Sequence, residues 1–454
     1  MTAPDLRTIV EVAPLVRSGA LSPVDLVRTC LDQIDARPDL NAFIARMDDE
    51  ALAVARERER EIAAGACRGP LHGIPIAVKD LVDVRGTRTT SGSALPADVA
   101  ERDAPAIAQL RAAGAIVIGK TNLHEFAFGT TSDETAFGPV RHPLDPSRSA
   151  GGSSGGSAAA LATGMCFGAL GTDTGGSIRI PSAVCGTVGL KPTLGEISTA
   201  GVVPLSTTLD HLGPMTRCVA DAALLVDVLK GRPAAAVGPA PEPLTFGVPR
   251  AYFCDVLERG VRATLDAALD ALAAAGHTVR TVEIAHAAWT ADVYLHIVLP
   301  EAARYHAAWL DRHAAAYSPG VRLRLEMGRY ILAEDYIRAL ELREVLTPAV
   351  DRALDGCHAL VLPALAIPAP PIGAPTVDVD GTSAPVRAIM LRLTQLFNIT
   401  GHPAVALPGG IAADGLPRGV QVVGRRHETE RLLDVAAVVE SVLAANAASR
   451  RVGA

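Results

Sequence analysis

The chain has 454 residues, of which 49% are hydrophobic and 20% charged, and its formal net charge is -7. This composition excludes a disordered or collagen-like chain and supplies enough apolar residues for a large buried core. The mild acidic excess gives no overall attraction to nucleic acid or to an anionic membrane, so we expect neither as a partner.

The first sixty residues are predicted to be helical. Ser22 and Pro23 have the types favoured at the N-cap and first turn of a helix, and apolar residues recur at helical spacing over 21–37. The charged stretch 48–61 predicts a second helix that faces solvent. We therefore expect residues 1–60 to form a helical segment on the outside of the fold.

An alternation of strands and helices begins after residue 70. The short apolar runs 74–78 and 115–118 are typical of strands buried on both faces, and residues 104–113 between them predict a helix. This strand–helix–strand order predicts an α/β fold with a substantially parallel sheet.

The later residues predict further helices and strands. Two helices, the second ended by Pro348, are expected over residues 259–275 and 321–346. Further strands are expected at 277–279, 359–362, 404–407 and 419–423.

No flexible linker divides the chain. The proline-rich segment 363–375 is predicted to be a surface or cleft-lining loop rather than a linker. We therefore predict a single domain over residues 1–454. It comprises the helical segment 1–60, a core over 61–220, and the rest of the sheet and the substrate pocket in 221–454.

The cysteines and the longest uncharged stretches indicate the cellular compartment of the protein. Seven cysteines, an odd number without CxxC spacing, disfavour a disulfide framework or zinc site and favour a reducing cytosol. The first residues lack the pattern of a signal peptide. Residues 150–172 are rich in glycine and 358–377 in proline, which disfavours a membrane helix in either. We predict a cytoplasmic protein.

Two short motifs match known catalytic loops but fail on their context. Residues 114–121 match GxxxxGK[ST], yet the four variable positions are Ala-Ile-Val-Ile, the predicted strand itself, rather than a loop that follows a strand. Residues 151–155 match GxSxG, but a polar loop precedes them where a nucleophile elbow needs an apolar strand. We expect neither a nucleotide hydrolase nor an α/β-hydrolase triad.

The segment 151–192 contains two glycine-serine clusters, GGSSGGS and DTGGS. Glycine at this density lets backbone N–H groups converge on one point, as an oxyanion hole requires. Serines in such turns are candidates for a nucleophile and a proton relay. Between the clusters, the apolar run 158–167 predicts a buried helix, which argues against a flexible linker.

The base for such a serine can be a histidine or a neutral lysine. The twelve histidines form no HExxH or other paired metal spacing. Only four of the 42 basic residues are lysine. Lys79 and Lys120 each end an apolar run, where burial can lower the pKa of an amine, whereas Lys191 is expected in a cap or turn.

With these motifs in order, the chain resembles the amidase signature family. The clusters GGSSGG and GTDTGGSIRIP within 151–192 match the family signature. Similar segments are GIPIAVKD at 73–80, GKTN at 119–122 and NITGHP at 398–403. The similarity covers nearly the whole chain and is densest over 71–220. It implies a mixed, largely parallel central sheet flanked by helices.

The resemblance also implies a Ser–cis-Ser–Lys triad with the cis peptide bond in the second glycine-serine cluster. Lys79 is the expected base, and Ser153 and Ser177 are both open to the roles of nucleophile and relay. We assign Ser177 as the nucleophile and Ser153 as the relay. The expected oxyanion hole consists of the backbone N–H groups of Thr174, Gly175, Gly176 and Ser177.

Supporting and substrate-binding residues are implied around this triad. The residues expected to hold the catalytic loops are Thr172, Asp173 and Arg179. The residues expected to line the acyl pocket are Ala127, Phe128, Gly129, Thr130 and Thr131. Further pocket candidates are Tyr336, Gln395 and Asn398.

The resemblance implies acyl transfer. We expect no metal or organic cofactor, because the sequence has no cluster of metal ligands and no dinucleotide-binding loop. We predict an amidase that cleaves the C–N bond of a small neutral carboxylic amide through an acyl-enzyme on Ser177. Alternatives are a carbamate or urea-derivative hydrolase, and the glutaminase-like A subunit of a tRNA-dependent amidotransferase, which commonly has Gln where this chain has His211. A non-enzymatic assembly subunit is a further alternative. The expected partner is a small-molecule amide or carbamate, and a homodimer is compatible with this prediction.

Overall fold

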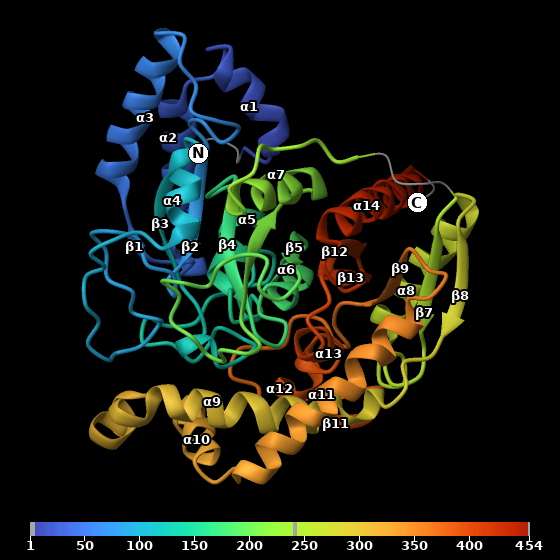
Figure 1. The fold of residues 1–454 in the computed structure, drawn as a ribbon. Helices are drawn as coiled ribbons and strands as arrows, with labels where there is room; N and C mark the ends of the chain where they lie inside the picture. The colour runs from blue at the N-terminus through green and yellow to red at the C-terminus, as the bar shows by residue number, and fades with distance from the viewer. Residues whose placement is uncertain (1–4, 239–242, 453–454) are drawn as a thin grey trace.

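A computed structural model describes residues 5–238 and 243–452 (Figure 1). Within these residues, an eleven-stranded sheet runs across the molecule. Its strands, in spatial order, are β1 (Phe43–Arg46), β3 (Ile116–Thr121), β2 (Pro75–Lys79), β4 (Gly168–Asp173), β6 (His211–Thr216), β5 (Val188–Lys191), β12 (Ala404–Ile411), β13 (Pro417–Val423), β9 (Ala359–Pro363), β7 (Thr245–Pro249) and β8 (Thr278–Val282).

The sheet is mixed, as expected, and the chain has an α/β fold. Parallel pairs occur in two blocks, β3–β2–β4 and β9–β7–β8. The strands between these blocks, and the edge pair β1–β3, are antiparallel. Six of the ten pairings described within this sheet are therefore antiparallel, so the parallel character expected from the strand–helix–strand order is restricted to the two blocks.

The apolar runs of the sequence form the buried centre of the sheet. Every residue of β2 and of β3 is buried, as expected for strands covered on both faces. Both strands extend beyond their apolar runs to end in polar residues, so Lys79 and Lys120 lie inside the fold.

Helices cover both faces of the sheet (Figure 1). α7 (Val219–Leu229), α14 (Thr429–Val452) and α8 (Arg259–Ala274) contact one another in series and pack on β5, β6, β12 and β13. α5 (Gly155–Ala162) and α6 (Arg179–Cys185) contact each other; α5 packs on β2, β4 and β6, and α6 packs on β5, β12 and β13. The helices near β1–β3 are α1 (Ile9–Arg17), α2 (Pro23–Ala36), α3 (Asp48–Ala63) and α4 (Pro105–Ala112).

A helical lobe lies beneath the sheet, at the bottom of Figure 1, beyond the ends of the strands. It is built from α9 (Thr290–His313), α10 (Pro319–Gly328) and α11 (Ala333–Ala353). The smaller elements beside it are the hairpin β10 (Thr376–Val379)–β11 (Thr382–Pro385) and the helices α12 (Val386–Leu391) and α13 (Gln395–Ile399).

Three sequence-based boundaries were wrong. The single helix expected over 321–346 is two helices, α10 and α11. Gly328 ends α10 so close to α9 that a Cβ atom there would lie 2.2 Å from the carbonyl oxygen of Leu299. Pro348 lies inside α11 and does not end it.

The other two differences concern shorter segments. The helical segment 1–60 also contains β1, which forms an edge strand of the sheet. The buried helix expected over 158–167 is α5, which begins earlier, at Gly155, and ends at Ala162. Among the described residues, none of the helices combines the length and apolar character that a membrane crossing requires.

Candidate active site

Lys79, the last residue of β2, lies in a cage of hydroxyl groups. Its side chain is fully buried, and Nζ contacts Ser153 Oγ at 2.7 Å, Ser154 Oγ at 2.9 Å and Thr172 Oγ1 at 2.7 Å. Burial lowers the pKa of Lys79 to about 7, although the carboxylates of Asp173 and Asp210 oppose this shift. A large share of this amine is therefore neutral near pH 7 and can accept a proton.

The neighbouring carboxylate, Asp80, does not pair with the Lys79 amine. Its side chain forms an ion pair with Lys120, with Oδ1 2.8 Å from Nζ, and accepts a hydrogen bond from the Thr90 backbone. Asp80 and Lys79 thus point to different partners, as expected for successive residues at the end of a strand. Lys120, the other lysine that ends an apolar run, is committed to this buried ion pair.

Ser153 belongs to the first glycine-serine cluster, in the turn before α5. The Gly152–Ser153 peptide bond is cis, so the expectation of a cis bond in the second cluster was wrong. The backbone at Gly152 packs closely against the loop that contains Ser132. A Cβ atom at Gly152 would lie 2.8 Å from Ser132 N. The carbonyl of Ser153 accepts hydrogen bonds from His124 N and Ser132 Oγ, both at 3.1 Å.

Ser177 lies in the second cluster, between β4 and α6. Its carbonyl accepts a hydrogen bond from Ser154 N at 3.2 Å, which places the two clusters side by side. Within the described chain, the N–H groups of Gly175, Gly176 and Ser177 donate to no other residue. N–H groups without a partner in one turn can donate to a tetrahedral oxyanion.

A buried ion pair holds the second cluster in place. Arg179 and Asp173 are both fully buried, with Nη2 2.9 Å from Oδ1 and Nε 3.0 Å from Oδ2. Burial alone would raise the pKa of Asp173, but the charge and hydrogen bonds of Arg179 hold this pKa below its ordinary value. The Asp173 carboxylate also accepts from Ile178 N, which fixes the turn that carries Ser177.

Distant residues complete this network. Arg179 donates to Asn398 Oδ1 and Gln421 Oε1, both at 2.6 Å, and the Thr394 hydroxyl donates to the carbonyl of Gly175. Asn398, predicted as a pocket residue, instead bonds Asp173 and Arg179. These contacts span more than 200 residues of sequence, so no local pattern could have revealed them.

The segment expected to line the acyl pocket packs directly on the first cluster. Ala127, Phe128, Thr130 and Thr131 are buried. A Cβ atom at Gly152 would lie 2.9 Å from the carbonyl carbon of Thr130, so this loop touches the turn of Ser153. Another pocket candidate, Tyr336, donates its hydroxyl to Glu301 at 2.9 Å within the helical lobe.

Two further side chains around the second cluster were not found from sequence. Tyr294 of α9 is buried, and a Cβ atom at Gly175 would lie 2.5 Å from its hydroxyl oxygen. Asp210 accepts a hydrogen bond from the Thr174 hydroxyl at 2.6 Å, and burial raises the pKa of Asp210 to about 6. Both residues confine the turn 174–177.

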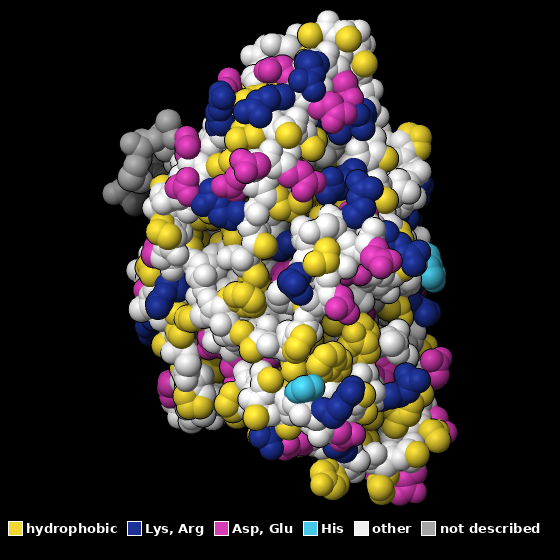
Figure 2. All heavy atoms as spheres, turned by 90° about the vertical axis from the view of Figure 1, so that its left-hand side faces the viewer, with side chains coloured by type: hydrophobic (Ala, Val, Ile, Leu, Met, Phe, Trp, Pro, Cys, Tyr) yellow, Lys and Arg dark blue, Asp and Glu magenta, His cyan; other side chains and the backbone are white. Residues whose placement is uncertain are grey.

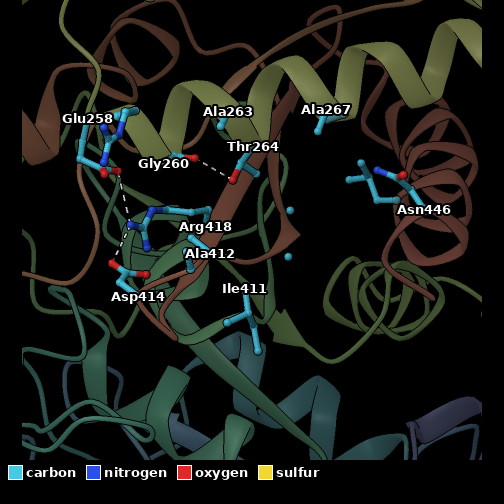
Figure 3. Close-up of a pocket in the computed structure, with 16 residues that line it drawn as sticks. Glu258, Gly260, Ala263, Thr264, Ala267, Ile411, Ala412, Asp414, Arg418 and Asn446 are labelled. Carbon is cyan, nitrogen blue, oxygen red and sulfur yellow. Dashed lines mark hydrogen bonds and ion pairs between the residues drawn. The ribbon is translucent and has the colours of Figure 1, made fainter. Parts of the chain in front are cut away.

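A cavity of about 820 Å³ lies elsewhere, between α8, the β12–β13 hairpin and α14 (Figure 3). Arg418 at its edge is ion-paired with Asp414 at 2.8 Å and with Glu258 at 3.3 Å. None of the predicted catalytic or acyl-pocket residues lines this cavity. Over 5–238 and 243–452, no three His, Cys, Asp or Glu side chains gather as a metal site.

Comparison with known proteins gives consistent matches along the chain. The family model described as Amidase matches residues 25–433. An amidase from Pseudomonas putida is 37% identical over 94% of this chain and 94% of its own. The A subunit of a glutamyl-tRNA(Gln) amidotransferase from Carboxydothermus hydrogenoformans is 34% identical over 95% of this chain and 96% of its own. A crystal structure of an amidase matches with a TM-score of 0.91 and 39% identity, over 96% of this chain and 99% of that one.

These matches and the fold define an enzyme that hydrolyses carbon–nitrogen bonds of amides. The chain belongs to the amidase signature family.

Proposed function

We propose that the chain hydrolyses a small carboxylic amide through an acyl-enzyme on Ser177, with Ser153 as relay and Lys79 as base. The observation that carries this proposal is the hydroxyl cage of Lys79, in which all three partners of a buried amine are hydroxyl groups. Such an amine lacks the charge partner that would keep it protonated, and one of its partners is the proposed relay.

The proposed reaction proceeds in two halves. Lys79 takes a proton from Ser153, which takes one from Ser177 as its Oγ bonds to the amide carbonyl carbon. The N–H groups of the turn 174–177 stabilise the oxyanion. The relay then returns the proton to the leaving nitrogen as the C–N bond breaks, and water releases the acyl group by the same steps.

The same site is compatible with a carbamate or urea derivative, because each presents a carbonyl carbon bonded to nitrogen. The similarity to the A subunit of an amidotransferase keeps glutamine as an alternative substrate. The similarity to the Pseudomonas putida amidase favours a free-standing amidase. The family resemblance favours it as well, because it implies Gln in the amidotransferase subunit where this chain has His211.

The first prediction tests the nucleophile with a fluorophosphonate probe, which forms an O–P bond with an activated serine and releases fluoride. We expect Ser177→Ala to abolish labelling and to lower turnover of an anilide substrate by about 10³-fold or more. Mass spectrometry of the labelled peptide identifies the serine.

The matched control is Ser198→Ala, at an exposed serine, which should label and turn over like the wild type. Ser153→Ala should slow both labelling and turnover. Labelling that persists in Ser177→Ala and disappears in Ser153→Ala would reverse the two serine roles. An unlabelled wild-type chain that hydrolyses no amide would refute the proposed function.

A further inference from the structure

Two guanidinium groups flank one aromatic ring of the expected acyl pocket. The Cζ atoms of Arg324 from α10 and of Arg387 from α12 lie 5.3 and 5.8 Å from the centroid of the Phe128 ring. Phe128 itself is buried. Two cations on one ring repel each other, so this arrangement needs negative charge nearby.

Only one of these two cations has a carboxylate partner among the described residues. Arg324 Nη2 lies 3.1 Å from Glu134 Oε2. Arg387 forms no ion pair and no hydrogen bond with any other described residue, and its Nε atom is buried without a partner. Burial and the charge of Arg324 lower the pKa of Arg387 to about 10, so it remains a cation at neutral pH.

The fully buried arginines of this fold, unlike the half-buried Arg387, are each paired with a carboxylate. Arg58 lies 3.1 Å from Glu61, Arg179 lies 2.9 Å from Asp173, and Arg418 lies 2.8 Å from Asp414 (Figure 3). A charge removed from water without a counter-ion is costly, and the fold avoids this cost at these three positions. Arg387 is half-buried and has no carboxylate partner among the described residues, so its charge is free to pair with an anionic group that does not belong to the chain.

The position of Arg387 connects it with the catalytic turn. The charge of Arg387 acts on the hydroxyl of Tyr294, and that hydroxyl lies against Gly175 of the proposed oxyanion hole. On its other side Arg387 faces Phe128, in the segment that touches the Ser153 turn. Arg387 thus lies between two parts of the expected site, the acyl-pocket segment at Phe128 and, through Tyr294, the turn that carries Ser177.

We propose that Arg387 binds a carboxylate at the far end of the acyl part of the substrate, so that the enzyme acts on monoamides of short dicarboxylic acids. This inference rests on the proposed function and replaces the expectation of a neutral amide. The C–N bond of the terminal amide breaks, Ser177 carries the half-acid as an ester, and water releases the dicarboxylate. The net reaction converts the monoamide and one water into a dicarboxylate and ammonium. A guanidinium suits this task because it presents paired N–H donors to a carboxylate.

The test compares charged and neutral amides of matched chain length. Succinamate, glutaramate and adipamate are assayed beside butanamide, pentanamide and hexanamide, with ammonium release as the readout. We expect the wild type to prefer the best anionic amide by about ten- to hundredfold in kcat/KM, the effect of one charged hydrogen-bonded contact. The series also reports the distance between the reacting carbonyl and the carboxylate site.

Two variants then assign this preference to one residue. Arg387→Gln should remove most of the preference, so that the ratio of kcat/KM for each anionic amide to kcat/KM for its neutral counterpart falls towards one. Arg392→Gln is the matched control, because Arg392 adjoins the same helix but contacts Tyr252 instead of Phe128. Its Cζ atom lies 4.0 Å from the centroid of the Tyr252 ring, and it donates to the Tyr252 carbonyl. It should keep the preference.

A binding measurement supplies a second readout. Succinate or glutarate should bind the Ser177→Ala chain in calorimetry, and adding Arg387→Gln should remove this binding. Equal wild-type rates on charged and neutral amides would overturn the inference while leaving amide hydrolysis intact. A preference that Arg387→Gln retains would overturn it as well. Failure to hydrolyse any amide, with no fluorophosphonate labelling, would instead overturn the proposed function.

Discussion

Lys79 shows how a few atoms around one side chain set its chemistry. Free lysine has a pKa near ~10.4 and is almost entirely protonated at neutral pH. Here burial at the end of β2 lowers the pKa to about 7, and the nearest carboxylate in the sequence, Asp80, is paired with Lys120 instead. Arginine could not replace this residue, because its guanidinium does not lose a proton in proteins.

The proposed base predicts the pH dependence of the reaction. Lys79 must be neutral to accept a proton, and it becomes neutral as the pH rises through its pKa of about 7. The rate should therefore rise with pH up to about 8 and then level off. The midpoint belongs to the coupled Lys79–Ser153–Ser177 network. Initial rates in constant-ionic-strength buffers measure the profile, and a rate that falls as the pH rises from 6 to 8 would contradict it.

The same argument predicts the outcome of a charge-conserving substitution. Lys79→Arg should lower kcat by about 10²- to 10⁴-fold, the usual contribution of a general base. Lys230→Arg is the control, because Lys230 pairs with Glu430 at 2.8 Å outside the site. It should leave the rate unchanged. A Lys79→Arg enzyme with most of the wild-type rate would rule out the neutral-lysine mechanism.

For single residues, the sequence was informative wherever the residue belongs to a recognisable motif. Lys79, Ser153 and Ser177 lie in recognisable local patterns, and the fold brings their segments together. Tyr294 and Arg387 have no such pattern, since each enters the site from a helix far away in the sequence. The sequence contains many arginines, and nothing in it distinguishes Arg387 from the others. Its proposed role becomes visible only when the structure shows its neighbours and shows that no described carboxylate pairs with it.

Among the elements, α5 connects the first glycine-serine cluster with the sheet. Its second residue, Gly156, lies so close to the backbone that a Cβ atom would be 2.4 Å from the carbonyl oxygens of both Ala42 and Asn122. Neither oxygen can move without shifting the chain around β1 and β3. The glycine is thus required by packing, independently of any role in catalysis.

This contact predicts the stability effect of one methyl group. Gly156→Ala should lower the free energy of unfolding by about 1–3 kcal/mol, the usual cost of overpacking a well-packed site. Urea denaturation followed by circular dichroism measures it. Gly238→Ala is the control, because the nearest atoms to its Cβ, in Asp434, would lie 3.4 Å away. A Gly156→Ala protein as stable as the control would contradict the close approach of α5 to the sheet.

Element types were predicted better than element boundaries. The short apolar runs correctly located strands β2, β3, β9, β12 and β13 because complete burial demands continuous apolar sequence. The break between α10 and α11 was missed, since helical periodicity continues through it. At the end of α10, Gly328 lies close against α9, a tertiary contact that periodicity does not encode. Likewise, strand direction in the centre of the sheet follows from connections that periodicity does not encode.

For the whole molecule, the distribution of charge on the surface indicates which partners the enzyme needs. On the face shown in Figure 2, basic and acidic side chains are intermixed rather than gathered into a basic field. The net charge of -7 agrees with this distribution. A polyanion such as tRNA is bound mainly through clustered positive charge, so these features favour an enzyme that acts without it.

We accordingly predict that the purified chain hydrolyses amides without tRNA or added subunits. Dialysis against a strong chelator should leave the rate unchanged, because the proposed mechanism uses only side chains and backbone N–H groups. Ammonium release before and after dialysis is the measurement. Activity that appears only with glutamine and two further subunits would support the amidotransferase alternative, and activity restored by one divalent ion would refute the cofactor-free mechanism.

The contacts of Arg179 also have a consequence for biosynthesis. The turn that carries Ser177 is among the earlier parts of the chain to leave the ribosome, yet Arg179 beside it is held by Thr394, Asn398 and Gln421. Until those residues emerge, the guanidinium lacks three of its acceptors, and the catalytic turn lacks the clamp from Thr394. We therefore expect nascent chains to remain inactive until translation is almost complete, so that a partly made enzyme does not consume amides in the cell.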